Sequence, residues 1–342
     1  MPYLIALSLA FIFSFIFTIQ AKKIALKYKI VDSPAPRKIH QKPIPLLGGT
    51  AIFLAFSLTA LIFWQQGLLT DQKISNLNIL AILLGGLILI IGGYFDDRYN
   101  LKPAGQFIFP VLATIIILVS GIKIEFITNP LGGILQISAT LGVSAAFFWI
   151  LGMIYTTKLL DGLDGLVSGI TAISALIIYL VSLSWDVAAS GTSFLALILA
   201  GSCLGFLIFN WHPAKIFLGE GGSVFCGFLL GVLAIISGSK IATALLIMGV
   251  PVLDVAWVII RRIRQGLSPI KADSRHLHFR LLDIGLTHRG AVMFLYLISA
   301  AFGLASLFLP SVGKIIALGV LISLMIIFAG SLVIVYKFKK ND

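Results

Sequence analysis

The stretch Lys158-Leu159-Leu160-Asp161-Gly162-Leu163-Asp164-Gly165 lies between two long apolar segments of the chain. Both segments are predicted to be helices, over residues 140–157 and 165–184. If the connection is helical, its spacing puts the carboxylates of Asp161 and Asp164 on one face. The glycine after each acid allows a backbone or a phosphate to come close. One acid is enough to cap the next helix, so the second indicates a functional site.

Apolar residues dominate the rest of the chain as well. Of its 342 residues, 59% are hydrophobic and 11% are charged, and the mean hydropathy is +1.08. Continuous apolar runs of membrane-spanning length favour helices over a closed barrel. We predict an all-α, polytopic integral membrane protein in which residues 1–342 form a single domain with about eleven transmembrane helices. The predicted spans are 3–20, 47–64, 78–95, 103–121, 140–157, 165–184, 190–209, 220–237, 241–260, 291–309 and 314–336.

The net charge of +12 is explained by membrane orientation. Of the 25 Lys and Arg residues, 21 fall in loops on one side of the predicted spans and 4 on the other. Because basic residues are retained on the cytoplasmic side, the N-terminus is predicted outside and the C-terminus inside. The basic loops are therefore expected to face the cytoplasm, and no nucleic-acid partner is expected.

Five carboxylates lie at predicted cytoplasmic helix ends, and all five histidines are in loops on the same side. The positive-inside rule does not explain this, since acids contribute little to it. Carboxylate oxygens suit Mg²⁺, and Mg²⁺ commonly joins one or two carboxylates to substrate phosphates. We predict a phosphate site that uses Mg²⁺, or Mn²⁺, where cytosol meets lipid. The carboxylates are those of Asp96, Asp97, Asp161, Asp164 and Glu220.

Three of these acids have a simpler interpretation. The adjacent acids Asp96 and Asp97 repel each other and require a cation or a proton, but they could also be a solvated helix end paired with Arg98 and Lys102. Glu220 lies in a glycine-rich turn that opens a helix, where anions bind. It could hold a metal there, or it could be an ordinary first-turn acid.

The first predicted cytoplasmic loop, residues 21–46, is basic and proline-rich. Arg37, Lys38 and His40 could bind an anionic substrate or attract anionic headgroups. The pair Gly48-Gly49, which opens the next span, is consistent with tight helix packing or with close approach of a ligand.

The longest predicted cytoplasmic loop, residues 261–290, carries a second basic motif. Arg275, His276 and His278 are suited to clamp phosphate and sugar groups. Asp254, within the preceding span, is expected to turn inward to a partner such as Arg261. We expect a structural role for Asp254.

In combination, these motifs resemble the polyprenyl-phosphate N-acetylhexosamine-1-phosphate transferases, the MraY/WecA group. The resemblance covers nearly the whole chain and is closer to the UDP-N-acetylglucosamine branch. It is carried by Arg37-Lys38-Ile39-His40, Phe95-Asp96-Asp97-Arg98, Asp161-Gly162-Leu163-Asp164-Gly165-Leu166, Asn210 with Pro213-Ala214-Lys215, and Ala272-Asp273 with Arg275-His276-Leu277-His278.

The resemblance implies Mg²⁺-dependent transfer of N-acetylglucosamine-1-phosphate, or another N-acetylhexosamine-1-phosphate, from a UDP-sugar to undecaprenyl or decaprenyl phosphate. UMP is released and a lipid-linked cell-envelope glycan is started. The family analogy also suggests a homodimer. It implies a location in the plasma (inner) membrane of a prokaryote, with the active site facing the cytoplasm. The implied catalytic residues are Asp96, Asp97, Asp161 and Asp164. The implied metal ligands are Glu220, Asp164 and Asp161, and the implied substrate contacts are Arg37, Lys38, His40, Lys158, Asn210, Lys215, Arg275, His276 and His278.

Four residues depart from the family pattern. Tyr155 and Lys158 stand where family members usually carry Asn, Glu220 where Asp is usual, and Phe279 where a third histidine is common. Lys158 places a positive charge beside two acids, where it can lower their pKa or bind a phosphate. One alternative is therefore a catalytically impaired member that binds nucleotide-sugar or lipid without turnover. The other is a transporter, although transport sites lie near the bilayer midplane.

Overall fold

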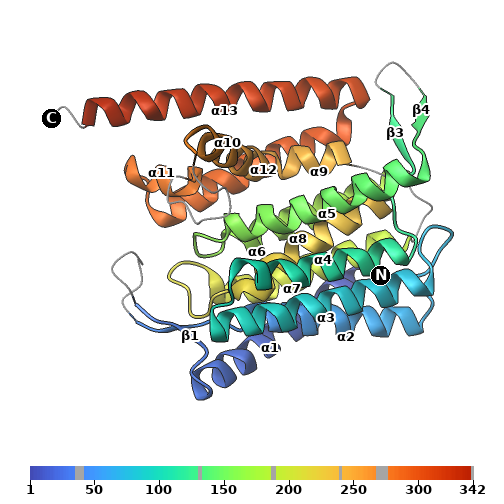
Figure 1. Cartoon of the computed structure of the whole chain (residues 1–342). Coiled ribbons are helices and arrows are strands. Elements are labelled where there is room, and N and C mark those ends of the chain that lie inside the picture. Colours follow the sequence, from blue (N-terminus) through green and yellow to red (C-terminus); the bar gives the residue numbers. More distant parts are fainter. Residues whose placement is uncertain (35–41, 130–132, 186–189, 239–240, 267–275, 340–342) are drawn as a thin grey trace.

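The computed structural model describes residues 1–34, 42–129, 133–185, 190–238, 241–266 and 276–339 (Figure 1). These ranges are mostly helical, and the few strands are two or three residues long. The helices are α1 Pro2–Lys27, α2 Gly48–Gln65, α3 Asn76–Tyr99, α4 Pro103–Val119, α5 Ala139–Leu160, α6 Leu166–Trp185, α7 Gly191–Asn210, α8 Gly219–Ile236, α9 Ile241–Ile247, α10 Gly249–Arg264, α11 Leu277–Asp283, α12 His288–Phe308 and α13 Ser311–Lys339.

The predicted all-α, polytopic membrane class is confirmed. Nine helices in the described ranges are long and apolar enough to cross a membrane, and α4 is an apolar helix just short of that length. The ninth predicted span, 241–260, is interrupted: α9 and α10 meet at Met248 with a bend of 80°. Pro251 has no N–H to bond to the carbonyl four residues earlier, which favours a break here. The sidedness of the termini stays a prediction.

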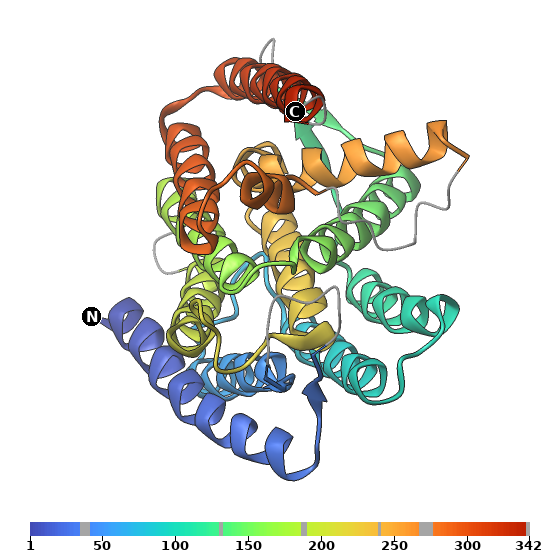
Figure 2. The same ribbon diagram turned by 90° about the vertical axis from the view of Figure 1, so that its left-hand side faces the viewer.

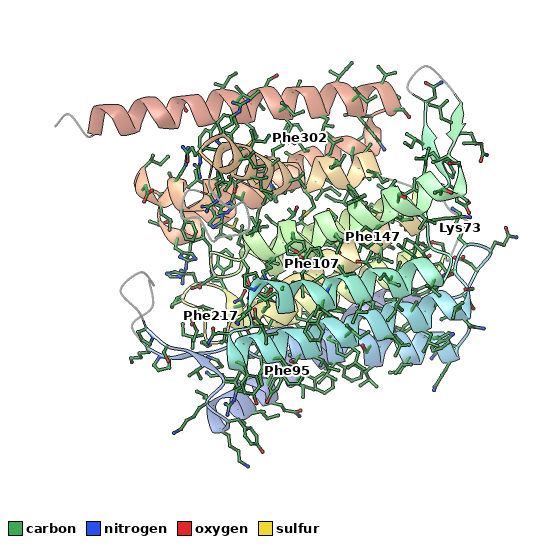
Figure 3. All side chains as sticks on the ribbon, in the orientation of Figure 1. Lys73, Phe95, Phe107, Phe147, Phe217 and Phe302 are labelled. Atoms are coloured by element: carbon green, nitrogen blue, oxygen red, sulfur yellow. The ribbon has the colours of Figure 1, made fainter. Side chains whose placement is uncertain are left out.

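The core of the bundle is formed by α7 and α8. Of their span residues, 78% and 89% are buried inside the protein. Helices α1 and α6 pack against α7, and α2, α3 and α5 pack against α8. Figure 2 views the bundle along the helices and shows α13 at its edge. Apolar side chains on the outer helices, such as Phe95 and Phe107, are 41% and 48% exposed (Figure 3), as expected of surfaces that contact lipid.

Glycines bring the ends of three helices into backbone contact. A Cβ atom on Gly49 of α2 would lie 2.2 Å from Cα of Gly222 in α8. A Cβ atom on Gly93 of α3 would lie 2.1 Å from Cα of Gly221. Of the two interpretations of Gly48-Gly49, the structure therefore supports helix packing. The contacts fix the polar ends of α2, α3 and α8 together.

Short strands tie the first loop to the same end of the bundle. Strands β1 Val31–Asp32 and β2 Ile44–Pro45 pair in antiparallel register on either side of residues 35–41. The carbonyl of Pro45 accepts a hydrogen bond from the N–H of Phe217 at 2.8 Å, two residues before α8 begins. A second pair, β3 Phe126–Thr128 with β4 Ile134–Gln136, lies at the opposite end (Figure 1).

Candidate active site

The N-terminus of α8 binds a carboxylate of the chain itself. The N–H of Glu220 donates to both Asp97 oxygens, at 3.2 Å each. Gly219, with φ of 74°, makes this approach possible: a Cβ atom there would lie 2.6 Å from Oδ2 of Asp97. The glycine-rich turn is thus an anion site, as predicted, and its ligand is Asp97. Arg98, the alternative partner of the acid pair, donates to the carbonyl of Tyr28 at 2.7 Å.

A chain of contacts joins Asp96 to Glu220 across four helices. The Lys158 ammonium contacts the carboxylate of Glu220 and donates to Oε1 of Gln106 at 3.0 Å. Nε2 of Gln106 in turn donates to Oδ1 of Asp96 at 3.0 Å. The same Asp96 oxygen accepts the N–H of Leu101 at 2.8 Å. The ends of α3, α4, α5 and α8 therefore meet at one polar cluster.

Asp161 connects this cluster to the central turn of the sequence. Asp97 interacts electrostatically with Glu220, Asp96 and Asp161, and Asp161 interacts with Glu220 and Asp164. Asp161 keeps an exposed surface, but surrounding protein atoms reduce the hydration of its carboxylate. This desolvation, together with the negative charges of Glu220 and Asp164, raises the pKa of Asp161 to about 7. Of the two roles expected for Lys158, lowering the pKa of the neighbouring acids or binding a phosphate, the first is not seen at Asp161.

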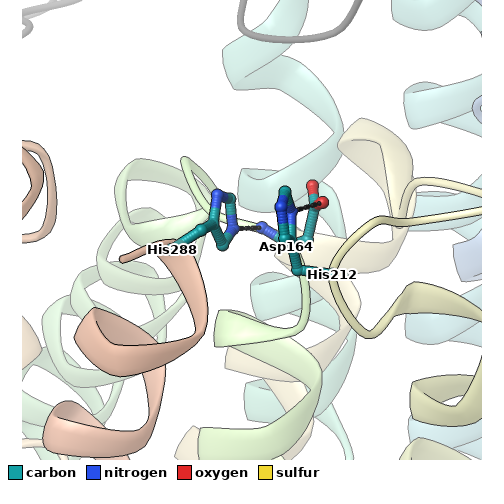
Figure 4. Close-up of side chains that lie close together, drawn as sticks. All are labelled: Asp164, His212 and His288. Carbon is teal, nitrogen blue, oxygen red and sulfur yellow. Dashed lines mark hydrogen bonds and ion pairs between the residues drawn. The ribbon is translucent and has the colours of Figure 1, made fainter. Parts of the chain in front are cut away.

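Asp164 forms a second polar cluster with His212 and His288, which we call the Asp164 group (Figure 4). Its Oδ2 atom is 2.6 Å from Nδ1 of His212 and accepts the N–H of Ala214 at 3.1 Å. The N–H of Asp164 donates to Nε2 of His288 at 2.9 Å. The ligand atoms of Asp164, His212 and His288 lie within 4.8 Å of one another. However, the two imidazoles stack at 3.9 Å with only 12° between their planes, so their nitrogens do not converge on one point.

The Asp164 group fixes the central turn against the segment before α8 and the start of α12. Sequence reasoning missed His212 and His288, which are 48 and 124 residues away from Asp164. Neither spacing carries a periodic signal that could have indicated the contact. Metal ligation by Asp164 stays a prediction.

Asn210 is buried and its side-chain oxygen is used within the protein. Its Oδ1 atom accepts the N–H of Gly165 at 3.0 Å and the hydroxyl of Ser168 at 3.1 Å. Its Nδ2 atom donates to the carbonyl of Ile216 at 3.0 Å. Asn210 therefore positions the central turn, and its predicted nucleotide contact stays a prediction. Lys215, nearby in the chain, has an exposed side chain.

The two described histidines of the last motif are buried beside the central turn. Nδ1 of His276 is 2.8 Å from Oδ2 of Asp254. The other carboxylate oxygen of Asp254, Oδ1, accepts a hydrogen bond from the N–H of Leu277 at 2.8 Å. Asp254 thus supports the start of α11, with His276 as a partner. A Cβ atom on Gly162 would lie 2.2 Å from Nε2 of His278, so this ring lies against the turn that carries Asp161.

His278 is neutral at physiological pH because burial lowers its pKa to about 4. Neither of its ring nitrogens has a hydrogen-bond partner within the described part of the chain. The predicted contact of His278 with a phosphate or a sugar stays a prediction. The other predicted contacts, Arg37, Lys38, His40 and Arg275, lie outside the described residues.

Several known proteins are similar in sequence to this chain over most of its length. A family model described as glycosyl transferase family 4 matches residues 79–238. A Bacillus subtilis (strain 168) protein, named probable undecaprenyl-phosphate N-acetylglucosaminyl 1-phosphate transferase, is 36% identical over 300 residues, which cover 85% of this chain and 80% of that protein. The decaprenyl-phosphate N-acetylglucosaminephosphotransferase of Mycolicibacterium smegmatis is 32% identical over 310 residues, which cover 83% and 76%.

A third relative, the undecaprenyl-phosphate alpha-N-acetylglucosaminyl 1-phosphate transferase of Yersinia pestis, is 28% identical over 308 residues, covering 85% of this chain and 80% of that protein. The chain forms a helical membrane bundle with interacting carboxylates at one end. Its similarity to these relatives identifies the class as a polytopic membrane transferase. The chain belongs to the polyprenyl-phosphate N-acetylhexosamine-1-phosphate transferases, the MraY/WecA family, as its motifs indicated.

Proposed function

We propose that this protein transfers N-acetylglucosamine-1-phosphate, or another N-acetylhexosamine-1-phosphate, from a UDP-sugar to undecaprenyl or decaprenyl phosphate. An oxygen of the lipid phosphate forms a bond to the phosphorus that carries the sugar, and the bond from that phosphorus to UMP breaks. The observation that carries the proposal is the interaction of Asp97, Asp161 and Glu220, which come from three separate segments of the chain. The names of the relatives support the lipid acceptor and the transferred sugar.

The donor set at this end of the bundle fits Mg²⁺. Its side chains are carboxylates, which are the ligands this ion prefers, and several of them interact with one another. Glu220 and Asp161 would hold the ion, with Asp164 as a further candidate. When bound, Mg²⁺ would neutralise the charge on the diphosphate of the UDP-sugar.

The chain's own residues would mainly position the two substrates. Phosphoryl transfer depends on alignment and charge stabilisation more than on covalent chemistry by the protein. Asp96 and Asp97, held by the N–H groups of Leu101 and Glu220, would face the lipid phosphate and accept its proton. His278, held against the turn that carries Asp161, would donate a hydrogen bond to the diphosphate or the sugar.

The proposed location is the cytoplasmic face of the plasma (inner) membrane of a prokaryote, where a soluble UDP-sugar can meet a lipid. The basic loops predicted on that side support this orientation. Family analogy also supports a homodimer, which a mass measurement of the detergent-solubilised protein tests.

The test is release of UMP by the purified full-length protein. The protein in detergent, with Mg²⁺ and undecaprenyl phosphate, is given UDP-N-acetylglucosamine and then other UDP-sugars. We expect UMP and a lipid-linked sugar in equal amounts, and loss of both when EDTA is added. No UMP from any UDP-sugar would reject the proposal.

A second candidate, binding without turnover, is motivated by the four departures from the family pattern. It is tested by the variant Tyr155→Asn, Lys158→Asn, Glu220→Asp and Phe279→His. An inactive wild type and an active variant with all four substitutions would establish this candidate. An active wild type would exclude it.

A further inference from the structure

Lys158 and Glu220 form an ion pair whose two ends are fixed by helix packing. Lys158 lies in the last turn of α5 and Glu220 in the first turn of α8. These helices touch at the backbone, because a Cβ atom on Gly227 would lie 2.4 Å from the carbonyl oxygen of Met153. The side chains of Lys158 and Glu220 are only 19% and 22% exposed. The pair is therefore more sheltered than a surface salt bridge.

Gln106 provides a second oxygen for the ammonium, and its orientation is determined by its other contacts. Its Nε2 atom donates to Oδ1 of Asp96 at 3.0 Å and to the carbonyl of Leu101 at 3.1 Å. Its Oε1 atom is therefore the one that faces Lys158, at 3.0 Å. Lys158 thus occupies a site with two oxygen partners from two other helices.

A small pocket lies beside the same site. Asp96, Gln106 and Glu220 line this pocket between α3, α4 and α8. The negative charges of Asp97 and Asp161 act on this region as well. A dissolved divalent cation is therefore attracted to the carboxylate that Lys158 already contacts.

We propose that Lys158 is a built-in cation that competes with the divalent metal for Glu220. The proposal rests on the function proposed above, in which Glu220 holds Mg²⁺. Mg²⁺ bound to a carboxylate oxygen lies about 2.0–2.1 Å from it, and two cations that close to one oxygen repel strongly. Metal binding at the Glu220 oxygen that Lys158 contacts therefore requires the ammonium to leave that oxygen. Lys158 sets the metal affinity of the site, and its freed ammonium is positioned to contact a substrate phosphate.

Mn²⁺ binding to the purified, full-length protein in detergent tests the proposal without substrate. Free Mn²⁺ is measured by electron paramagnetic resonance during titration. The variants Lys158→Gln and Lys158→Met remove the charge and retain most of the side-chain length, and Lys158→Arg retains the charge. Lys102→Gln, an exposed lysine at the start of α4, is the matched control. Thermal unfolding and gel filtration identify the variants that are folded.

We expect Lys158→Gln and Lys158→Met to bind Mn²⁺ about tenfold more tightly than the wild type, from the loss of one nearby positive charge. Lys158→Arg and Lys102→Gln should stay within about threefold of the wild type. Mn²⁺ binding that appears only in the two neutral variants would also support competition. Unchanged or weaker binding in those variants, or no binding in any protein, would overturn it.

The titration separates this proposal from the transferase proposal. A protein that releases no UMP but shows the Lys158 effect on Mn²⁺ would refute transfer and retain the competition. A protein that releases UMP and shows no Lys158 effect would refute the competition alone.

Discussion

The backbone N–H of Glu220 donates to both carboxylate oxygens of Asp97, at 3.2 Å each. This links an acid in the last turn of α3 to the N-terminus of α8, where the helix dipole favours negative charge. The same glycine-rich turn therefore presents the Glu220 side chain and holds a second carboxylate beside it. The sequence motif containing Asp96-Asp97 and the motif containing Glu220 form one structural unit.

Asp97→Asn tests the importance of the charge at this position. The amide keeps the shape of the side chain but removes the negative charge, so we expect kcat to fall by about 100-fold or more while the protein stays folded. UMP release and thermal unfolding are the measurements. Glu125→Gln, an exposed acid at the opposite end of the bundle, is the control and should stay within about twofold of the wild type.

Asp161→Asn should abolish UMP release and raise thermal stability. Because the pKa of Asp161 in the folded protein is about 7, above the usual aspartate value of 3.8, folding disfavours its ionised form. The folded state binds more protons than the unfolded state between these pH values, so the cost to stability grows as pH rises from about 4 to 7.

The increase in melting temperature caused by Asp161→Asn should therefore be largest in metal-free protein above pH 7, and it should shrink as pH falls toward 4. Melting temperatures of wild type and variant across this pH range are the measurement. An unchanged or lower melting temperature for the variant at pH 7.5 would contradict this account of Asp161.

His278 should make the folded protein less stable in mild acid. Its pKa is about 4 in the folded protein, below the usual histidine value of 6.5. The unfolded state therefore binds more protons between these two pH values, and stability falls as pH falls through this window. Between pH 7 and pH 5 the free energy of unfolding falls by about 2 kcal/mol from this titration.

The variant His278→Asn lacks this titration, and its stability should depend less on pH between 7 and 5. The comparison is made by chemical denaturation in detergent at both pH values. Equal pH dependence in wild type and variant would show that His278 is not buried in its neutral form.

The sequence predicted the helical spans well because long apolar runs need no knowledge of tertiary contacts. The bend at Met248 was missed because residues 241–260 are apolar on both sides of the break, although Pro251 was a local sign of it. Of the acids expected at helix ends, Asp97 and Asp161 each interact with Glu220, while their roles as catalytic residues and metal ligands stay predictions.

The partners of these acids could not be predicted from the sequence. The contact between Lys158 and Glu220 depends on how α5 packs on α8, and the bond between Asp164 and His212 joins residues 48 positions apart. Asn210 matched a family motif for nucleotide contact, yet its side chain bonds to Gly165 and Ile216. Composition and periodicity describe single helices, whereas these contacts depend on the relative placement of several helices.

The contacts of Gly49 with Gly222 and of Gly93 with Gly221 have a consequence for how this site can vary. The spacing between the acid-bearing helices is set by main chain against main chain, so no rotamer change can absorb an added methyl group. Chemical identity at the helix ends is less restricted, since Glu220 stands where the family usually has aspartate and Lys158 where it has asparagine. The fold therefore restricts residue type more tightly at the glycine contacts between the helices than at the positions of Lys158 and Glu220.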